Sequence, residues 1–334
     1  AHIPYPSTPN FKNFTTDYQK LLVSDAAAKY TPTRASFVGT VKLHGTNATV
    51  VFSHGDKSNP RIQSRSWIIG SNKKDNMGTY ALLSKAPLAS LVDQILAARG
   101  QSTFNEIFIA GEIAGRGVQK GVAIVALERF FAIFNIRIDG HWVDIRQYKS
   151  CSLPEYRIFN VAEYKTYEID IDFSGSTAAA HERMNEYTTE VYDACPFGSA
   201  FVDEKGKQVS GRGEGIVWTM VGGDGKQFDD TVLWNFKTKG ESFSTTSAPK
   251  EKKAVVGDPA TASAVMQFVD YALAERRFEQ GVEYLEGEQA RQGKPVAGYD
   301  IRSLGVFMKW VVEDTIKEER NEMERLGAPE KDAR

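Results

Sequence analysis

The chain has 334 residues, 41% of them hydrophobic and 25% charged, a balance that excludes disordered, collagen-like and disulfide-scaffold proteins. Lys and Arg total 41 against 43 for Asp and Glu, so the net charge is -2, which excludes a globally basic nucleic-acid binder but allows a local basic site. Cys151 and Cys195 are too few for a disulfide framework or a thiolate zinc site, and we expect both to be buried as small hydrophobic residues.

The first 20 residues are polar and interrupted by prolines, without the apolar core of a secretion signal. No run of 18 or more apolar residues occurs anywhere in the chain. We therefore expect a soluble intracellular protein, most simply cytoplasmic, that has no membrane partner and is a monomer.

Short apolar or alternating runs between turn residues predict strands along the first two thirds of the chain. These runs cover residues 36–43, 48–52, 107–113, 130–138, 142–145, 215–221 and 232–236. Helices are predicted at residues 86–99 and 161–167. Residues 36–243 should therefore form a mixed, mainly antiparallel α+β domain.

The composition changes after residue 243. Residues 244–259 are rich in Ser, Lys and Pro, which is typical of a linker, and they include Lys250, Lys252 and Lys253. Apolar residues at helical spacing within 265–272 and 304–311 predict two helices beyond it. We expect a small helical domain there, with a solvated, frayed end after residue 313.

The strand at residues 36–43 runs into a lysine and then a Gly-Thr-Asn turn. Lys42 and His44 share one face because side chains two apart on an extended chain point the same way. A lysine held near other cations or out of water loses its proton more readily and can act as a nucleophilic amine. The alternative is a lysine at a strand end that extends its ammonium group into water.

Two carboxylates interrupt apolar segments. Glu112 lies in the middle of the apolar run 107–115, and Glu214 lies between two glycines. Burial of an unpaired carboxylate is costly, so each should have a cationic partner or a ligand that supplies one. A structural ion pair would satisfy the same requirement.

Lys237 and Lys239 lie on one face of a predicted strand, because one residue separates them. Two ammonium groups side by side repel each other unless an anion lies between them, which makes the pair a candidate phosphate site. Two solvated lysines on an edge strand remain the alternative.

Six short motifs occur in one order along the chain. Lys42 to Asn47 reads as lysine, any residue, His-Gly-Thr-Asn; the others lie at residues 64–66, 111–120, 131–134, 214–215 and 237–239. In order and approximate spacing they resemble the ATP-dependent RNA ligases of the T4 RNA ligase 2 family, which belongs to the covalent nucleotidyltransferase superfamily. Asn135 departs from the family pattern, which often has an acidic residue there, so no metal role is assigned to it.

The resemblance implies an α+β, antiparallel-sheet nucleotidyltransferase domain of ATP-grasp-like ligase type at residues 1–248. A small all-helical RNA-binding domain would follow at residues 249–334. The implied activity is RNA ligation: Lys42 attacks ATP to form lysyl-AMP, AMP passes to an RNA 5′-phosphate, and a 3′-hydroxyl displaces it, as in the repair of nicks in duplex RNA. The partners would be ATP, Mg²⁺ or Mn²⁺, and RNA.

The same resemblance implies the site residues. Catalytic groups would be Lys42, His44, Glu214, Lys237 and Lys239. Nucleotide contacts would come from Val41, Lys42, Leu43, Asn47, Arg65, Glu112, Phe134, Lys237 and Lys239. Within the second set, Glu112 would bind the ribose, Phe134 would stack on adenine and the Val41 backbone would meet the adenine edge. Glu214 is the expected metal-linked carboxylate, and His44 would matter for the later RNA steps.

Three other functions remain open. A DNA ligase or a capping-type nucleotidyltransferase shares the superfamily motifs, although both usually carry a β-rich domain after the paired lysines, where this chain has helical spacing. A non-catalytic RNA-binding module would require Lys42 to be unreactive.

Overall fold

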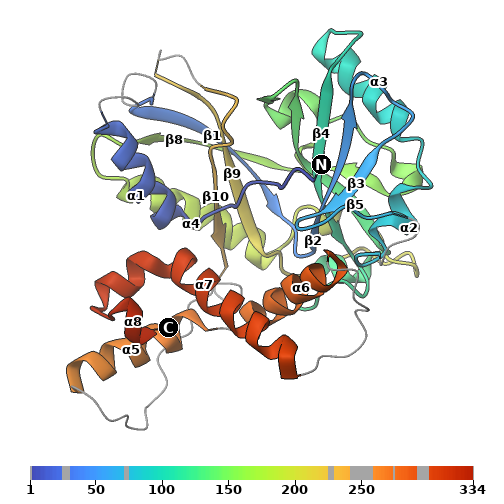
Figure 1. Cartoon of the computed structure of the whole chain (residues 1–334). Coiled ribbons are helices and arrows are strands. Elements are labelled where there is room, and N and C mark those ends of the chain that lie inside the picture. The colour runs from blue at the N-terminus through green and yellow to red at the C-terminus, as the bar shows by residue number, and fades with distance from the viewer. Residues whose placement is uncertain are drawn as a thin grey trace. The chain divides into compact units, whose positions relative to one another are not determined.

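The computed structural model describes residues 2–24, 31–70, 75–224, 229–240, 259–273, 275–291 and 301–333. It divides into one unit at Ala1–Gly240 and a second at Glu241–Arg334 (Figure 1). The expected domain boundary after residue 248 and the lysines at 250, 252 and 253 lie outside the described residues. They stay predictions.

Two sheets form the centre of the first unit. The four-stranded sheet is antiparallel and has the order β10 (Asn235–Lys239), β9 (Gly215–Gly223), β1 (Arg34–Lys42) and β8 (Thr166–Asp172). The second sheet has the order β3 (Arg61–Ser64), β2 (Thr46–Ser53), β4 (Glu106–Ala114), β5 (Phe130–Ile138) and β6 (His141–Trp142), and β7 (Ile158–Asn160) pairs with β5 in parallel. This arrangement confirms the expected mixed, mainly antiparallel α+β fold.

Helices cover the outer faces of both sheets (Figure 1). Helices α1 (Phe11–Leu22) and α4 (Ala178–Asp193) pack on the four-stranded sheet, and α3 (Leu88–Arg99) packs on the six-stranded sheet beside α2 (Thr79–Leu83). Short 3-10 helices occur at Ala123–Ala126, Ile145–Tyr148, Pro154–Tyr156, Val161–Glu163 and Gly198–Ala200.

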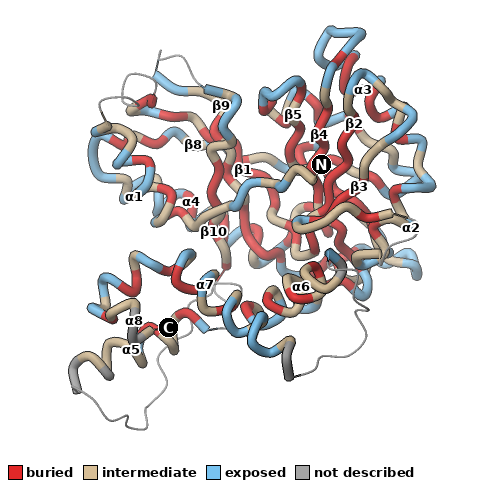
Figure 2. The backbone as a smooth tube through the Cα atoms, viewed as in Figure 1, coloured by how far each residue is buried: buried red, intermediate tan, exposed pale blue. Residues whose placement is uncertain are grey.

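The buried residues concentrate along the strands, as Figure 2 shows. Apolar residues of β2, β4 and β5 alternate between α3 on one face and a smaller cluster around Phe108 and Trp142 on the other. Because both faces of these strands are buried, their sequences are short, nearly continuous apolar runs, and this pattern predicted them. Cys151 and Cys195 are both buried free thiols, as expected.

Three local predictions for the first unit were wrong. The predicted helix at residues 161–167 is a 3-10 turn at Val161–Glu163 followed by β8, whose alternating sequence from Thr166 pairs with β1. The predicted strand at residues 142–145 keeps only Trp142, because the Asp144 side chain accepts from Arg146 N and starts a 3-10 helix. The strand predicted at residues 232–236 begins at residue 235.

The second unit is helical in its described residues: α5 (Pro259–Ala272), α6 (Glu275–Arg291), α7 (Ile301–Arg325) and α8 (Glu330–Ala333). Both helices predicted by spacing are present. The end of α7 is not a solvated, frayed tail, because Ile316 and Met323 are buried against Phe268 of α5. In the described residues no helix is long and apolar enough to cross a membrane.

Candidate active site

The three strands β1, β9 and β10 place two predicted lysines around one glycine. Lys42 and Lys239 are both register partners of Gly215. Antiparallel partners point to the same face, so the two lysine side chains flank a position without a side chain. A Cβ on Gly215 would lie 2.1 Å from the Thr238 carbonyl oxygen, so only glycine fits without separating the strands.

Glu214, one residue earlier, is the carboxylate that the lysines share. Lys42 Nζ donates to its Oε2 at 2.6 Å, and Lys239 Nζ lies 3.3 Å from its Oε1. His44 Nδ1 lies 3.6 Å from the same Oε2. The Glu214 side chain is 0% exposed, against 19% for Lys42 and 12% for Lys239. Such a buried carboxylate is tolerable because cations compensate it, and it accepts the hydrogen bond that the Lys42 amine donates.

Glu112 holds the turn that follows β1. Its Oε1 accepts a hydrogen bond from Gly45 N at 3.0 Å, and Glu112 is the cross-strand partner of Asn47. A Cβ on Gly45 would lie 2.1 Å from the Ile113 carbonyl oxygen, so the turn needs glycine. This contact fixes the residues between Lys42 and Asn47. It gives Glu112 a structural partner in addition to any ribose contact.

Asn47 carries unused hydrogen-bonding capacity. Its Oδ1 is buried, and no described residue bonds to it. A buried polar atom without a partner is costly, so this amide is suited to a substrate group.

A β-bulge turns two successive residues of β5 to the same side. Ala110 pairs with Asn135 but Gly111 pairs with Ile133, so Phe134 is the extra residue. The rings of Phe134 and Tyr5 meet edge to face at 5.2 Å, and Asn135 Nδ2 donates to the Tyr5 hydroxyl at 2.6 Å. The sheet face that carries Glu112 therefore also presents the Phe134 ring.

Tyr5 contacts the candidate site, and the sequence analysis missed it. Its hydroxyl also accepts from Asn235 Nδ2 of β10 at 3.1 Å, so one side chain joins the two sheets. Burial is the main cause that raises the pKa of Tyr5 above its ordinary value, and the nearby Glu112 charge acts in the same direction. The prolines on either side of Tyr5, which favour an extended backbone, were the available signal.

The other residues predicted for the site differ in how far their side chains are exposed. Lys237 is on the same face as Lys239, and its backbone N donates to Pro9 O at 2.9 Å. Arg65 is exposed and directly follows Ser64, the β3 residue that pairs with Ala48 of β2. It therefore lies at the same end of the six-stranded sheet as Asn47. Val41 and Leu43 are buried at 2% and 5% exposure, so only their backbone could meet a nucleotide.

The donor set limits how a metal could bind. In the part of the chain that the structure describes, no group of three or more His, Cys, Asp or Glu side chains could hold a metal ion. Magnesium often takes one or two carboxylates and completes its shell with water and substrate phosphates. Glu214 therefore fits a metal ion only together with a nucleotide, and its metal role stays a prediction.

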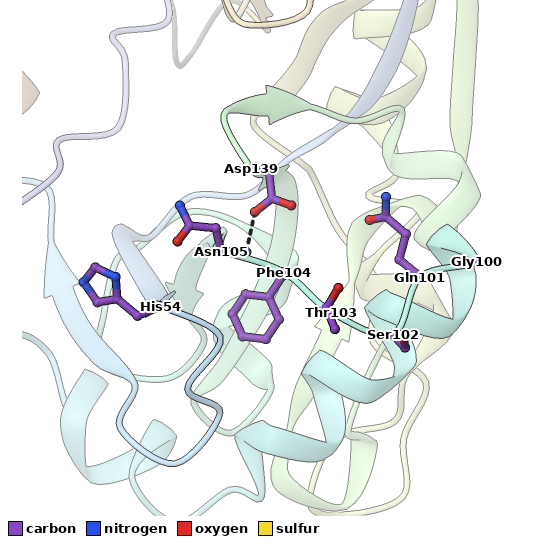
Figure 3. Close-up of a pocket in the computed structure, with 8 residues that line it drawn as sticks. All are labelled: His54, Gly100, Gln101, Ser102, Thr103, Phe104, Asn105 and Asp139. Atoms are coloured by element: carbon purple, nitrogen blue, oxygen red, sulfur yellow. Dashed lines mark hydrogen bonds between the residues drawn. The ribbon is translucent and has the colours of Figure 1, made fainter.

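A separate cavity of about 730 Å³ lies at the other end of the six-stranded sheet (Figure 3). It is lined by His54, residues 100–105 and Asp139. Glu106, at the near end of β4, is six residues from Glu112, which corresponds to roughly 20 Å along a strand. None of the predicted site residues lines this cavity.

The Lys42 amine bonds to a buried carboxylate whose other oxygen faces Lys239, two strands away in the same sheet. This arrangement is suited to nucleophilic attack on an anionic substrate. The sequence model described as RNA ligase matches residues 35–233, more than half of the chain. The chain belongs to this family. No curated protein matches it.

Similar solved structures come from Naegleria gruberi RNA ligase. A mutant with ATP and Mn has 14% sequence identity and a TM-score of 0.41, and the match covers 72% of this chain and 57% of that one. A mutant with AMP and Mn has 15% identity and a TM-score of 0.42, with the same coverage. The form with PPi has 14% identity, a TM-score of 0.41 and again 72% and 57% coverage. The match therefore spans just over half the length of these relatives.

Proposed function

We propose that the chain is an ATP-dependent RNA ligase that joins 3′-hydroxyl and 5′-phosphate ends through a covalent lysyl-AMP on Lys42. The observation that carries the proposal is the 2.6 Å contact of Lys42 Nζ with the buried Glu214 carboxylate, with Lys239 on its other oxygen. Membership of the RNA ligase family supports it.

In the first step the neutral Lys42 amine would attack the α-phosphorus of ATP. A nitrogen–phosphorus bond forms, the bond from the α-phosphorus to the bridging oxygen breaks, and pyrophosphate leaves. Glu214 Oε2, which accepts a hydrogen bond from Lys42 Nζ, could take the proton that Lys42 must first lose. Lys237 and Lys239 would then offset the charge that grows on the phosphates.

The nucleotide would be held by residues from both sheets. Phe134 would stack on adenine, Glu112 would bind the ribose, and Arg65 would contact the phosphate or the RNA end. The buried amide of Asn47 would satisfy its hydrogen bonding on the substrate near the α-phosphate. The backbone at Val41 and Leu43 would meet the adenine edge.

A divalent ion, Mg²⁺ or Mn²⁺, would accompany ATP and stabilise charge on its phosphates. The Naegleria relatives solved with ATP or AMP also contain Mn. Glu214 is the residue of this chain that we propose to hold it.

In the second and third steps AMP would pass to an RNA 5′-phosphate and a 3′-hydroxyl would then displace it. We propose nicked duplex RNA as the substrate, the second unit as an RNA-binding part, and His44 as a residue required after adenylylation. A DNA ligase, a capping-type nucleotidyltransferase and a non-catalytic RNA-binding module are the competing functions.

The test is transfer of label from α-labelled ATP to the protein with Mg²⁺. We expect wild type to be labelled on Lys42 and Lys42→Ala to be unlabelled, because the variant lacks the amine that bonds to Glu214 Oε2. Lys57→Ala, which removes a lysine paired with Asp93 elsewhere, is the control and should be labelled normally. Labelling of Lys42→Ala would refute the assignment.

Sealing assays separate the remaining functions. Nicked duplexes with RNA or DNA on the 3′-hydroxyl side should be sealed preferentially with RNA. Equal or better sealing of DNA would favour a DNA ligase, and an unlabelled wild-type protein that binds RNA would favour the non-catalytic module.

A further inference from the structure

Helix α4, which contains none of the family motifs, contacts both chain neighbours of Lys239: Thr238 on β10 and Gly240 just beyond its end. Thr238 Oγ1 lies 2.6 Å from Thr188 Oγ1. Gly240 lies against the ring of Tyr192, so closely that a Cβ on this glycine would fall 2.1 Å from a ring carbon. Thr188 and Tyr192 are one helical turn apart and therefore face the same strand.

The buried hydroxyls form a chain of hydrogen bonds whose direction is fixed. Trp218 Nε1 donates to Thr238 Oγ1 at 3.0 Å, and Thr188 Oγ1 donates to the Met184 carbonyl oxygen at 2.7 Å. Each hydroxyl has one proton, so Thr238 must donate the bond between the two threonines. Thr188 and Thr238 are 4% and 8% exposed, and Trp218 is 0% exposed. Each donor in this series of hydrogen bonds therefore bonds to a protein atom and not to water.

The same helix also positions the residue before Glu214. Gly213 N donates to the Val191 carbonyl oxygen at 2.9 Å, and Gly240 N donates to the Glu214 carbonyl oxygen at 3.1 Å. A Cβ on Gly213 would fall 2.7 Å from that Val191 oxygen. One face of α4 therefore contacts both segments that carry the charges around Lys42.

This anchoring matters because β10 is the edge strand of its sheet and has only five residues. A slip by one residue would move Lys237 and Lys239 to the opposite face, where Thr238 now lies. A much smaller shift would still change the 3.3 Å contact between Lys239 and Glu214. Displacements of about 1 Å in a reacting constellation can cost about 100-fold in rate.

We infer that Thr188 is a positioning residue for the ligase reaction, which acts through Thr238 to hold Lys239, and with it Lys237, against Glu214. The inference rests on the proposed function. Thr188 touches no predicted substrate group, so its effect has to travel through the strand.

The experiment measures Lys42 labelling in a single turnover at saturating ATP with Mg²⁺, for wild type, Thr188→Val and Thr188→Ser. Valine preserves the shape and removes the hydroxyl, whereas serine keeps it. We expect valine to lower the rate constant about tenfold or more and serine to remain within about threefold of wild type. The final labelled fraction should stay high in all three, because a misplaced lysine slows the step in every folded molecule.

Thr79→Val is the matched control. Thr79 is buried like Thr188, at 0% exposure, and donates one hydroxyl hydrogen bond, to Asn76 O, but it lies at the start of α2. A Thr188→Val rate constant within about twofold of wild type would overturn the inference, and so would an equally large fall in the rate constant of Thr79→Val. A Thr188→Val variant that loses only part of its final labelled fraction, with an unchanged rate constant, would overturn it too. Failure of serine to restore the rate would overturn it as well.

A second measurement is independent of ATP. Hydrogen exchange of the β10 amides in nucleotide-free protein should accelerate in Thr188→Val and not in Thr79→Val. Unlabelled wild-type protein would refute the proposed function alone, since the exchange result would still report whether Thr188 holds β10. Unchanged exchange in Thr188→Val would refute the positioning role.

Discussion

Replacing Glu214 with glutamine removes the charge that Lys42 and Lys239 share while keeping the shape of the side chain. Taken singly at an effective dielectric of about 20, the 2.6 Å and 3.3 Å contacts correspond to about 6 and about 5 kcal/mol of attraction. Repulsion between the two lysines and the desolvation of all three groups oppose these terms. Loss of one partner from such a buried cluster typically costs about 3 to 5 kcal/mol.

We therefore expect Glu214→Gln to lower the melting temperature of the nucleotide-free protein by roughly 10 °C, because a unit of this size loses about 2 to 4 °C per kcal/mol. The assay is thermal unfolding followed by calorimetry. Glu168→Gln is the control: Glu168 lies on β8 of the same sheet and pairs with Arg146 of the 3-10 helix Ile145–Tyr148, but its side chain is 70% exposed. An exposed pair contributes at most about 1 kcal/mol. A Glu214→Gln melting temperature no lower than that of the control would refute the reasoning.

The other predictions concern the turn, the strand and a thiol. His44→Ala should still label Lys42 with AMP but fail to seal RNA nicks, and intact sealing would refute its role in the later steps. Gly215→Ala should lose labelling, because its Cβ would lie 2.1 Å from the Thr238 carbonyl oxygen, whereas Gly222→Ala on the same strand meets nothing within 4 Å and should be labelled normally. Normal labelling of Gly215→Ala would contradict the tight fit. Burial raises the pKa of Cys151 to about 11 from 9.0, so its contribution to stability is complete below pH 9 and declines as pH rises towards 11. At pH 8 iodoacetamide should alkylate it only after unfolding, since about one native thiol in a thousand is then ionised, and rapid alkylation of folded protein would show otherwise.

The sequence by itself determined the local features. Short apolar or alternating runs placed most strands of both sheets. Residue spacing put Lys42 beside His44 and Lys237 beside Lys239, because it depends only on the geometry of one extended segment. The motif order also indicated the RNA ligase family. The wrong predictions from the sequence, such as a helix at residues 161–167, concern short segments whose patterns suit both a helix and a strand.

Only the tertiary structure decided which distant residues meet. Lys42 and Glu214 are 172 positions apart, and their contact depends on the register of two strands that no local pattern specifies. The bulge at Phe134 is an extra residue that does not alter the apolar pattern of β5. Thr188 lies on a helix that the sequence analysis did not find. Its role follows from packing, because a hydroxyl positions a strand only when another element presses it against that strand.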